Sequence, residues 1–275
     1  MLRSMITSTN TMNQLQKQLD TIGHNISNID TQGYKRTETS FNELIRQQFN
    51  NQPNENKEIG RLTDFGIRQG TGARLAQKLV FTQGSLKQTG RQLDVALTNL
   101  GQFLQVNVDG EIRYTRDGAL YLSPSTDGSN SLTLVTAEGH QVLDENQNSI
   151  VLDDSFKELV ISKEGTLTAV AKNSGDLPQI FDLGIVQANR PQMLTQTGSN
   201  LYGLSENGNI NDVLTLLDGD LKNQVGIQQG TLEMSNVDLS KEMTDLMISQ
   251  RSYQMNAKSI TMGDQMLGLI NGVRS

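Results

Sequence analysis

Residues 102–122 read QFLQVNVDGEIRYTRDGALYL and carry the clearest strand pattern in the chain. Apolar and polar side chains alternate on both sides of Asp109-Gly110, as they do where one face of a strand is buried. An Asp-Gly pair between two alternating segments is typical of a tight β-hairpin. Asp117-Gly118 marks another turn. The stretch therefore predicts antiparallel strands joined by short turns.

The residues that follow continue this pattern of short strands and turns. Glu138-Gly139 and Glu164-Gly165 separate further alternating segments. Strands that recur roughly every eight to twelve residues favour an antiparallel sheet or a partly closed barrel. The additional predicted strands are residues 132–136, 140–143, 149–152, 158–162, 166–170, 179–188 and 200–204.

Proline, glycine and methionine divide the chain into a middle region and two ends. All four prolines and 20 of the 25 glycines lie in residues 50–232, whereas nine of the ten methionines lie outside that range. Ends without proline and with little glycine favour helix. We therefore predict an α+β protein with a mainly antiparallel β central region and long N- and C-terminal helices that pair as a coiled coil. The predicted parts are an N-terminal helical arm (1–49), an extended linker (50–72), a β-rich middle domain (73–232) and a C-terminal helical arm that pairs with the first arm (233–275).

The N-terminal arm has an apolar seam with a heptad period. A period of 3.5 residues keeps one apolar stripe facing a partner helix. Gly33 is expected to end this helix, and a second short helical pattern follows at Phe41, Leu44, Ile45 and Phe49. The seam residues are Met5, Met12, Leu15, Leu19, Ile22, Ile26 and Ile29.

The C-terminal arm has a seam of the same period. Ser235 and Asp238 have capping-box spacing, which predicts a helix start nearby. A helix from Leu239 to Val273 would be about 52 Å long, which suits a coiled coil. The alternative is that both arms are ordinary helices packed on the chain's own β core. The seam residues are Leu239, Met243, Leu246, Tyr253, Ala257, Ile260, Leu267 and Ile270.

A few further residues complete the predicted subunit interface. Asn25, Asn28 and Asn236 are candidates for hydrogen bonds between subunits or, equally well, for local turn capping. Gly33 and Tyr34, at the predicted end of the first helix, are included with them.

Composition and charge exclude several classes of protein. The 275 residues carry 23 Lys and Arg against 30 Asp and Glu, so the chain lacks the basic surface that nucleic-acid binding needs. No apolar run approaches the ~18 residues required to cross a bilayer, and no membrane insertion is expected. The sequence after Arg3 is not typical of a cleaved secretory signal. Because cysteine is absent, disulfides, thiol catalysis and Cys metal sites are excluded.

No motif in the sequence supports a catalytic or cofactor site. Neither His24 nor His140 has a second histidine or an acidic cluster at ligand spacing, so each is expected to be a plain surface residue. Asp144, Asn146 and Asn148 resemble the first positions of a calcium loop, but the required Gly and the final Glu are both replaced by Ser. An ordinary Asn-rich turn is the favoured interpretation. We therefore expect no enzymatic activity, no cofactor and no metal.

Several motifs, in fixed order, resemble those of the bacterial flagellar rod and hook-basal body family. LDTIGHNISNIDTQGYK at 19–35 resembles its N-terminal signature, and QGTLEMSNVD at 229–238 and QRSYQMN at 250–256 resemble its closing motif. Between them, QGSL at 83–86 and YTRDG at 114–118 resemble the distal-rod branch. The resemblance spans essentially the whole chain.

This resemblance implies a structural axial subunit of the flagellar basal body. It implies a homo-polymer built through the terminal helices that transmits torque from motor to hook. The partners would be other rod and hook subunits and the flagellar type III export apparatus, which would carry the chain across the cytoplasmic membrane into the cell envelope. The alternatives are a hook or hook-associated subunit, and a secreted β-rich cell-wall hydrolase. The hydrolase would need paired carboxylates and aromatic subsites, which the sequence does not offer.

Overall fold

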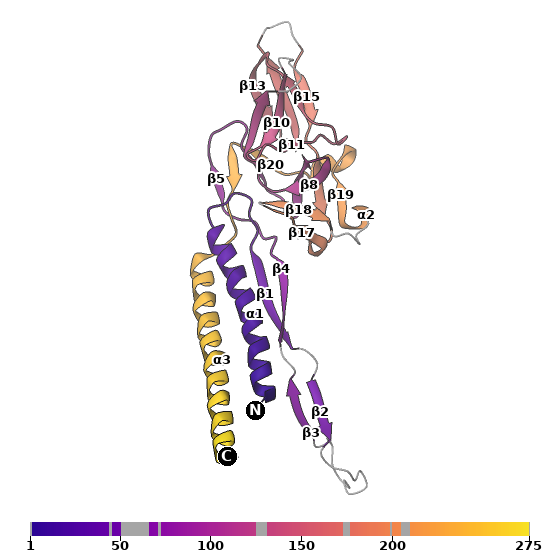
Figure 1. The fold of residues 1–275 in the computed structure, drawn as a ribbon. Helices are drawn as coiled ribbons and strands as arrows, with labels where there is room; N and C mark the ends of the chain where they lie inside the picture. The colour runs from indigo at the N-terminus through magenta and orange to yellow at the C-terminus, as the bar shows by residue number, and fades with distance from the viewer. Residues whose placement is uncertain are drawn as a thin grey trace. The chain divides into compact units, whose positions relative to one another are not determined.

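The computed structural model describes residues 2–43, 46–50, 66–70, 73–124, 131–172, 177–198, 200–204 and 210–274. The chain forms two compact units. The helical unit contains Met1–Ile26, Thr37–Lys78 and Leu239–Ser275, and the β unit contains Ser27–Arg36 and Leu79–Asp238 (Figure 1). The α+β class and the antiparallel central region are therefore confirmed. No helix among the described residues has the length and apolar character needed to cross a membrane.

Two long helices dominate the helical unit. Helix α3 spans Leu239–Arg274, as predicted, and is continuous through all three of its glycines. Helix α1 spans Leu2–Ser27 and ends before Gly33, so the predicted seam residue Ile29 lies outside it. The reason is a polar turn, in which Thr31 donates from its backbone N–H to the Asn28 carbonyl and from its hydroxyl to the Asn28 side chain.

The two helices lie against each other and run antiparallel. Near the end of α1, the Asn25 side-chain amide donates to Glu242 in the first turn of α3 at 3.2 Å. Near the start of α1, the Met5 side chain lies against Gly263, where an added Cβ would come within 3.0 Å of Met5 Cγ. These contacts place α1 beside α3 in the single chain (Figure 1), and the pairing of the two whole arms as a coiled coil stays a prediction. A supercoiled heptad geometry for this pair remains a prediction.

The structure has strands where the sequence pattern around Phe41 predicts a helix. Strand β1 (Thr37–Glu43) pairs with β4 (Ala73–Leu79), and β2 (Arg46–Asn50) pairs antiparallel with β3 (Gly66–Gly70). Pairing with distant segments satisfies the backbone of these residues and overrides a short helical pattern. Of the predicted linker 50–72, residues 66–70 belong to β3. Leu44, Ile45, 51–65 and 71–72 lie outside the described residues.

A ten-stranded antiparallel sheet forms the body of the β unit. Its order is β12-β10-β11-β7-β8-β18-β17, while β16 pairs with β7 and β19, and β9 pairs with β10. The predicted hairpin is confirmed, because Val108 pairs with Glu111 across Asp109 (φ 52°) and Gly110 (φ 87°). The strands are β7 Gln102–Val108, β8 Glu111–Thr115, β9 Leu120–Pro124, β10 Ser131–Thr136, β11 Gln141–Val142, β12 Val151–Asp153, β16 Ile185–Ala188, β17 Leu194–Gln196, β18 Leu201–Leu204 and β19 Leu214–Leu216.

Smaller sheets complete the β unit. Strands β13 (Phe156–Ile161), β14 (Thr166–Ala171) and β15 (Gln179–Asp182) form a three-stranded sheet. The single strand predicted over 179–188 is thus divided into β15 and β16. Between them lies Gly184, where an added Cβ would be 2.5 Å from the Asp144 carbonyl oxygen. The remaining elements are β5 Leu86–Gln88 paired with β21 Thr231–Glu233, β6 Val95–Leu97 paired with β20 Ile227–Gln229, the short helix α2 Ile210–Val213, and 3-10 turns at Pro191–Met193 and Gly219–Gln224.

Strand β7 separates two hydrophobic cores. Leu104 belongs to a large aliphatic cluster, and Phe103 belongs to a smaller aromatic cluster with Tyr202. Successive side chains of a strand point to opposite faces, so a continuous apolar run can serve both cores. The Phe103 and Tyr202 rings are 5.4 Å apart, and Phe81 contacts Phe103 edge-on at 5.7 Å.

Candidate functional site: a buried ion network

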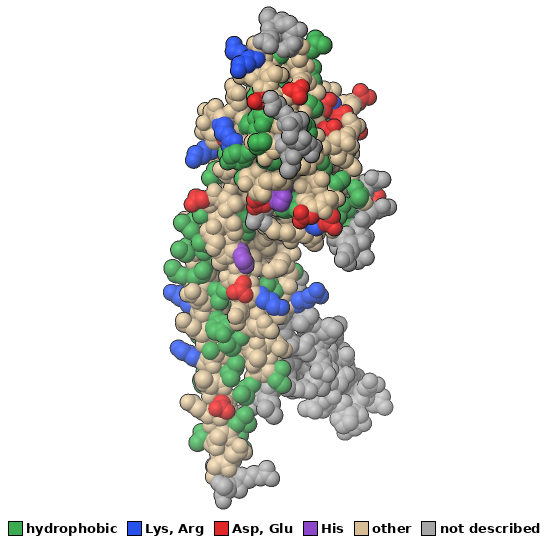
Figure 2. Space-filling view, turned by 45° about the horizontal axis from the view of Figure 1, so that its top comes forward, with side chains coloured by type: hydrophobic (Ala, Val, Ile, Leu, Met, Phe, Trp, Pro, Cys, Tyr) green, Lys and Arg blue, Asp and Glu red, His purple; other side chains and the backbone are tan. Residues whose placement is uncertain are grey.

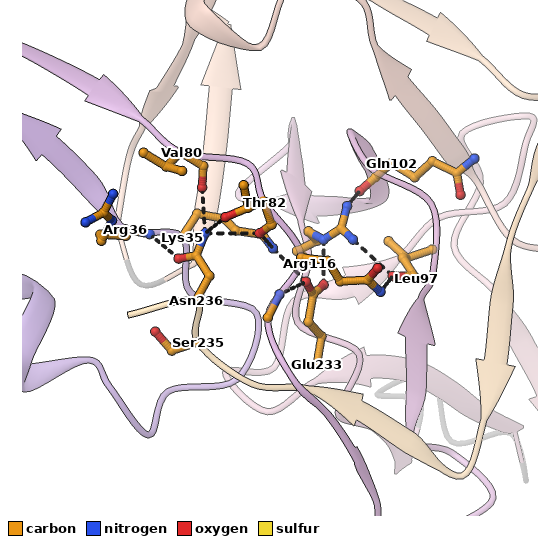
Figure 3. A network of polar contacts seen from close by, with 12 residues as sticks. Lys35, Arg36, Val80, Thr82, Leu97, Gln102, Arg116, Glu233, Ser235 and Asn236 are labelled. Atoms are coloured by element: carbon orange, nitrogen blue, oxygen red, sulfur yellow. Dashed lines mark hydrogen bonds and ion pairs between the residues drawn. The ribbon is translucent and has the colours of Figure 1, made fainter. Parts of the chain in front are cut away.

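Three charged residues that are far apart in sequence meet inside the β unit (Figure 3). Lys35 Nζ lies 2.6 Å from Glu233 Oε1, and Arg116 Nε lies 2.6 Å from Glu233 Oε2. All three side chains are at most 1% exposed. One carboxylate of the last strand of the β unit therefore pairs with two cations, one supplied by the segment after α1 and one by the turn after β8.

Every charged group of this network is also hydrogen-bonded to backbone. Such bonds are required, because a buried charge is costly unless it is paired and its remaining donors and acceptors are satisfied. Glu233 additionally accepts from the backbone N–H of Gly84 at 2.9 Å. The other bonds run from Lys35 to the Thr82 carbonyl at 2.9 Å and from Arg116 to the carbonyls of Leu97, Asn99 and Gln102 at 3.0–3.1 Å.

Burial and the excess of positive charge lower the pKa of Lys35. Burial, and next the nearby Arg116 guanidinium, lower the pKa of Lys35 from 10.5 to about 8, although the Glu233 carboxylate acts in the opposite direction. Lys35 is thus the group in the network that titrates just above neutral pH.

A pH dependence of stability follows from this shift. Because the unfolded chain holds the Lys35 proton up to pH 10.5 and the folded chain releases it near pH 8, the free energy of unfolding should rise between these values, by up to about 3 kcal/mol. Urea denaturation across this pH range gives the free energy of unfolding of the wild-type chain and of Lys35→Met. The difference between the two values at each pH isolates the contribution of Lys35. A difference that stays flat, or that falls with pH, would contradict the lowered pKa.

Two glycines allow the backbones around the network to approach closely. Gly33 has φ +68°, and a Cβ there would lie 2.6 Å from the backbone of Arg116. A Cβ at Gly84 would lie 1.9 Å from the Met234 carbonyl oxygen. Gly33 also donates its backbone N–H to the Glu233 carbonyl at 2.8 Å. The glycines of the signature motifs therefore serve close backbone contact.

Asn236 extends the network along the same segment. Its side-chain oxygen accepts from the Arg36 backbone N–H at 2.7 Å, and its amide donates to the carbonyls of Val80 and Thr82 at 2.8 and 3.0 Å. The hydrogen-bonding groups of Asn236 are therefore used within the chain. The predicted capping box at Ser235 is wrong, because α3 begins four positions later and the Ser235 hydroxyl accepts from the Val237 backbone N–H.

Comparison with known proteins gives matches along most of the chain. Three families match: Flagella basal body rod protein over residues 5–35, Flagellar hook protein FlgE/F/G D1 domain over 100–169, and Flagellar basal body rod FlgEFG protein C-terminal over 228–273. The flagellar hook-basal body complex protein FlhP of Bacillus subtilis is 51% identical over 276 residues, which cover all of both chains. The chain belongs to the flagellar basal-body rod family. The flagellar basal-body rod proteins FlgG of Bacillus subtilis and Borreliella burgdorferi are 32% and 30% identical over 97% and 100% of this chain, and over 97% and 99% of their own length.

This membership confirms the resemblance noted in the sequence. The chain is a rod-type structural protein of the flagellar basal body and not an enzyme. Each of the three matched regions contributes one member of the ion network, namely Lys35, Arg116 and Glu233. The motifs are recognisable in the sequence, but the meeting of these three side chains was not predicted from it. In each motif, a charged residue among apolar residues or glycines was the feature that could have indicated a buried ion pair.

The predicted interface residues of this rod protein differ widely in exposure. Leu15 and Ile22 are buried in the helical unit, and Gly33 and Tyr34 are buried in the β unit. Asn25 is also buried and bonds to Glu242 and to both backbone groups of Thr37. The half-buried members are Met5, Met12, Leu19, Ile26, Asn28, Ile29, Asn236, Leu246, Tyr253, Ala257, Ile260 and Leu267. The exposed members are Leu239, Met243 and Ile270.

Helix α3 carries a second apolar stripe that was not predicted from the sequence. Ile248, Met255, Met262 and Leu269 follow one another at seven-residue steps and are 56–70% exposed, and Met266 lies beside them. We call these five residues the outer stripe. They lie on the side of α3 opposite to the partly buried seam, since their helical phases differ by about half a turn. Figure 2 shows hydrophobic side chains at the surface along the helical unit. The signal in the sequence was a second set of apolar residues that repeats every seven positions beside the seam.

The described residues outside the network offer no metal site. Among the described residues, no three His, Asp or Glu side chains are grouped so that they could hold a metal. In the loop that resembles a calcium site, Asp144 and Asn148 are hydrogen-bonded to each other. The backbone N–H of Asn148 donates to the Asp144 side chain at 2.7 Å, and the backbone N–H of Asp144 donates to the Asn148 carbonyl at 2.8 Å. This arrangement is a turn closed by the Asp144 side chain and backbone.

Proposed function

We propose that this chain is an axial rod subunit that polymerises through its terminal helices and transmits torque from the motor to the hook. It is exported through the flagellar type III system into the cell envelope, where it contacts other rod and hook subunits. The observation that carries this proposal is the outer stripe of α3. In the single chain, α1 contacts α3 at Glu242 and Gly263, and the outer stripe is left in water.

A helix with apolar residues on two opposite faces can bury both faces only with a second partner. The first partner of α3 is α1 of the same chain. In this proposal another copy of the chain or another axial subunit supplies the second. Three of the five stripe residues are methionines at 69%, 56% and 46% exposure (Met255, Met262 and Met266), and unbranched methionine adapts to neighbours of different shape.

The polymer geometry follows from the nature of such a contact. The outer stripe and the surface that receives it are different, so the contact joins subunits head to tail. A head-to-tail contact that does not close gives a helical polymer. Close-packed apolar interfaces resist compression, which suits a shaft under torque. The exposed seam residues Leu239, Met243 and Ile270 would contribute to further subunit contacts on other sides of α3, whereas buried Leu15 and Ile22 hold α1 within the chain.

A double substitution in the outer stripe tests the proposal. Met255→Asp with Met262→Asp should abolish incorporation into basal bodies and swimming, because two charges would have to be desolvated at each contact. The dilute chain should keep its helical circular dichroism, since both positions face water in it. Met255→Leu with Met262→Leu, which keeps the stripe apolar, is the matched control and should swim. Normal incorporation of the aspartate variant, read by its presence in purified basal bodies, would exclude the outer stripe as a subunit contact.

A further inference from the structure

Residues 231–236 form a segment whose residues Thr231, Leu232 and Glu233 are buried and which makes several polar contacts with the rest of the β unit. We call this segment the latch. Its strand partner β5 has only three residues, all of them in the exposed class, and a two-stranded pairing of that size is weak by itself. Beyond this pairing, Met234 donates to the Ser85 carbonyl at 2.9 Å and the Glu233 carbonyl accepts from Gly33 at 2.8 Å. The buried side chain at the centre of the latch is therefore decisive for its position.

That side chain is Glu233, and the site that receives it is cationic. Lys35 and Arg116 are both buried, and among the described residues Glu233 is the carboxylate that pairs with either of them. The Gly84 backbone N–H points into the same place and donates to Glu233 at 2.9 Å. We call Lys35, Arg116 and this N–H the socket. Without Glu233 the socket would hold two buried cations and no anion, which is strongly unfavourable.

The charge pattern also fixes the register of the latch. A shift by one residue would bring Leu232 or Met234 to the socket and turn every side chain of the latch to the opposite face. Asn236 adds a second fixed point, because its side chain bonds at once to Arg36, Val80 and Thr82. No apolar contact could reject the shifted register as sharply as an unpaired buried charge does.

We propose that the β unit closes by docking of the latch into the socket, with the Glu233 carboxylate as the ligand that the socket recognises. The last β segment of the chain thus behaves as an intramolecular ligand, and its correct docking defines the position from which the chain continues into α3. This device operates in the single chain and goes beyond the proposed assembly function.

Hydrogen exchange on the full-length Glu233→Gln variant tests this proposal. The backbone amides of Gly33, Gly84 and Met234 should exchange about 100-fold faster or more, because the uncharged side chain leaves both cations unpaired. The amides in the β7–β8 ladder should change by less than about threefold, since the main sheet does not depend on the latch. Glu111→Gln is the control, because Glu111 is 69% exposed and pairs with Arg113 at the surface. Unchanged latch amides, or equal acceleration in the latch and in β7–β8, would overturn the proposal.

A second variant tests the socket as a carboxylate site. Glu233→Ala removes the side chain and leaves room beside Lys35 and Arg116. Formate at about 100 mM should then slow exchange of the latch amides by about tenfold or more relative to sodium chloride of equal ionic strength. The slowing should be lost in the Lys35→Met, Glu233→Ala double variant. Equal effects of formate and chloride would overturn the proposal. Both experiments use the dilute chain, so they can fail without affecting the assembly proposal, and the outer-stripe experiment can fail without affecting this one.

Discussion

Arg116→Met is expected to lower the free energy of unfolding of the β unit by about 3–5 kcal/mol. The guanidinium pairs with Glu233 and also donates to the carbonyls of Leu97, Asn99 and Gln102. Methionine fills a similar volume but satisfies none of these acceptors, and a buried acceptor without a partner is costly. Urea denaturation followed by tyrosine fluorescence measures the loss, because four of the five tyrosines (Tyr34, Tyr114, Tyr121 and Tyr202) belong to the β unit.

The same substitution at Arg113 is the matched control. Arg113 belongs to the same hairpin, but its side chain is 26% exposed and its partner Glu111 is 69% exposed. An exposed ion pair contributes at most about 1 kcal/mol, so Arg113→Met should have a small effect. Equal destabilisation by the two variants would show that the buried network has no special energetic role.

Ile22→Asp is expected to unfold the helical unit while the β unit remains folded. Ile22 is only 4% exposed on α1, and a charge placed there has no partner among the apolar seam residues. An unpaired buried charge typically costs several kcal/mol, and we expect this cost to exceed the free energy that stabilises the pair of helices. Far-UV circular dichroism should lose most of its helical signal, the tyrosine unfolding transition should be retained, and cells with this variant should not swim.

Ile6→Asp is the control within the same helix. Ile6 is 59% exposed, so the same change there should leave the helical circular dichroism intact. The free energy of unfolding of the helical unit should stay within about 1 kcal/mol of the wild-type value. If Ile22→Asp kept its helical signal, the pairing of α1 with α3 would not depend on the seam. If the tyrosine transition disappeared as well, the two units would not fold independently.

Local patterns were sufficient to predict most elements of this protein. The Asp109-Gly110 hairpin was predictable because two residues with positive φ specify the turn without help from distant parts of the chain. Helix α3 was predictable because its 36 residues contain no proline and repeat an apolar period. The short pattern around Phe41 was misleading, because a strand partner at 73–79 supplied backbone bonds that local sequence does not reveal.

The amino-acid order therefore defined the class, the long helices, the main hairpin and the family, all of which depend on neighbours within a few turns or on motifs in fixed order. The folded chain alone brought Lys35, Arg116 and Glu233 together, since residues 198 positions apart meet only when the β unit closes. It also showed which heptad phase of α3 is covered by α1 and which is left in water. Burial and ion pairing are properties of distance in space, and the spacing of residues along a chain does not contain that information.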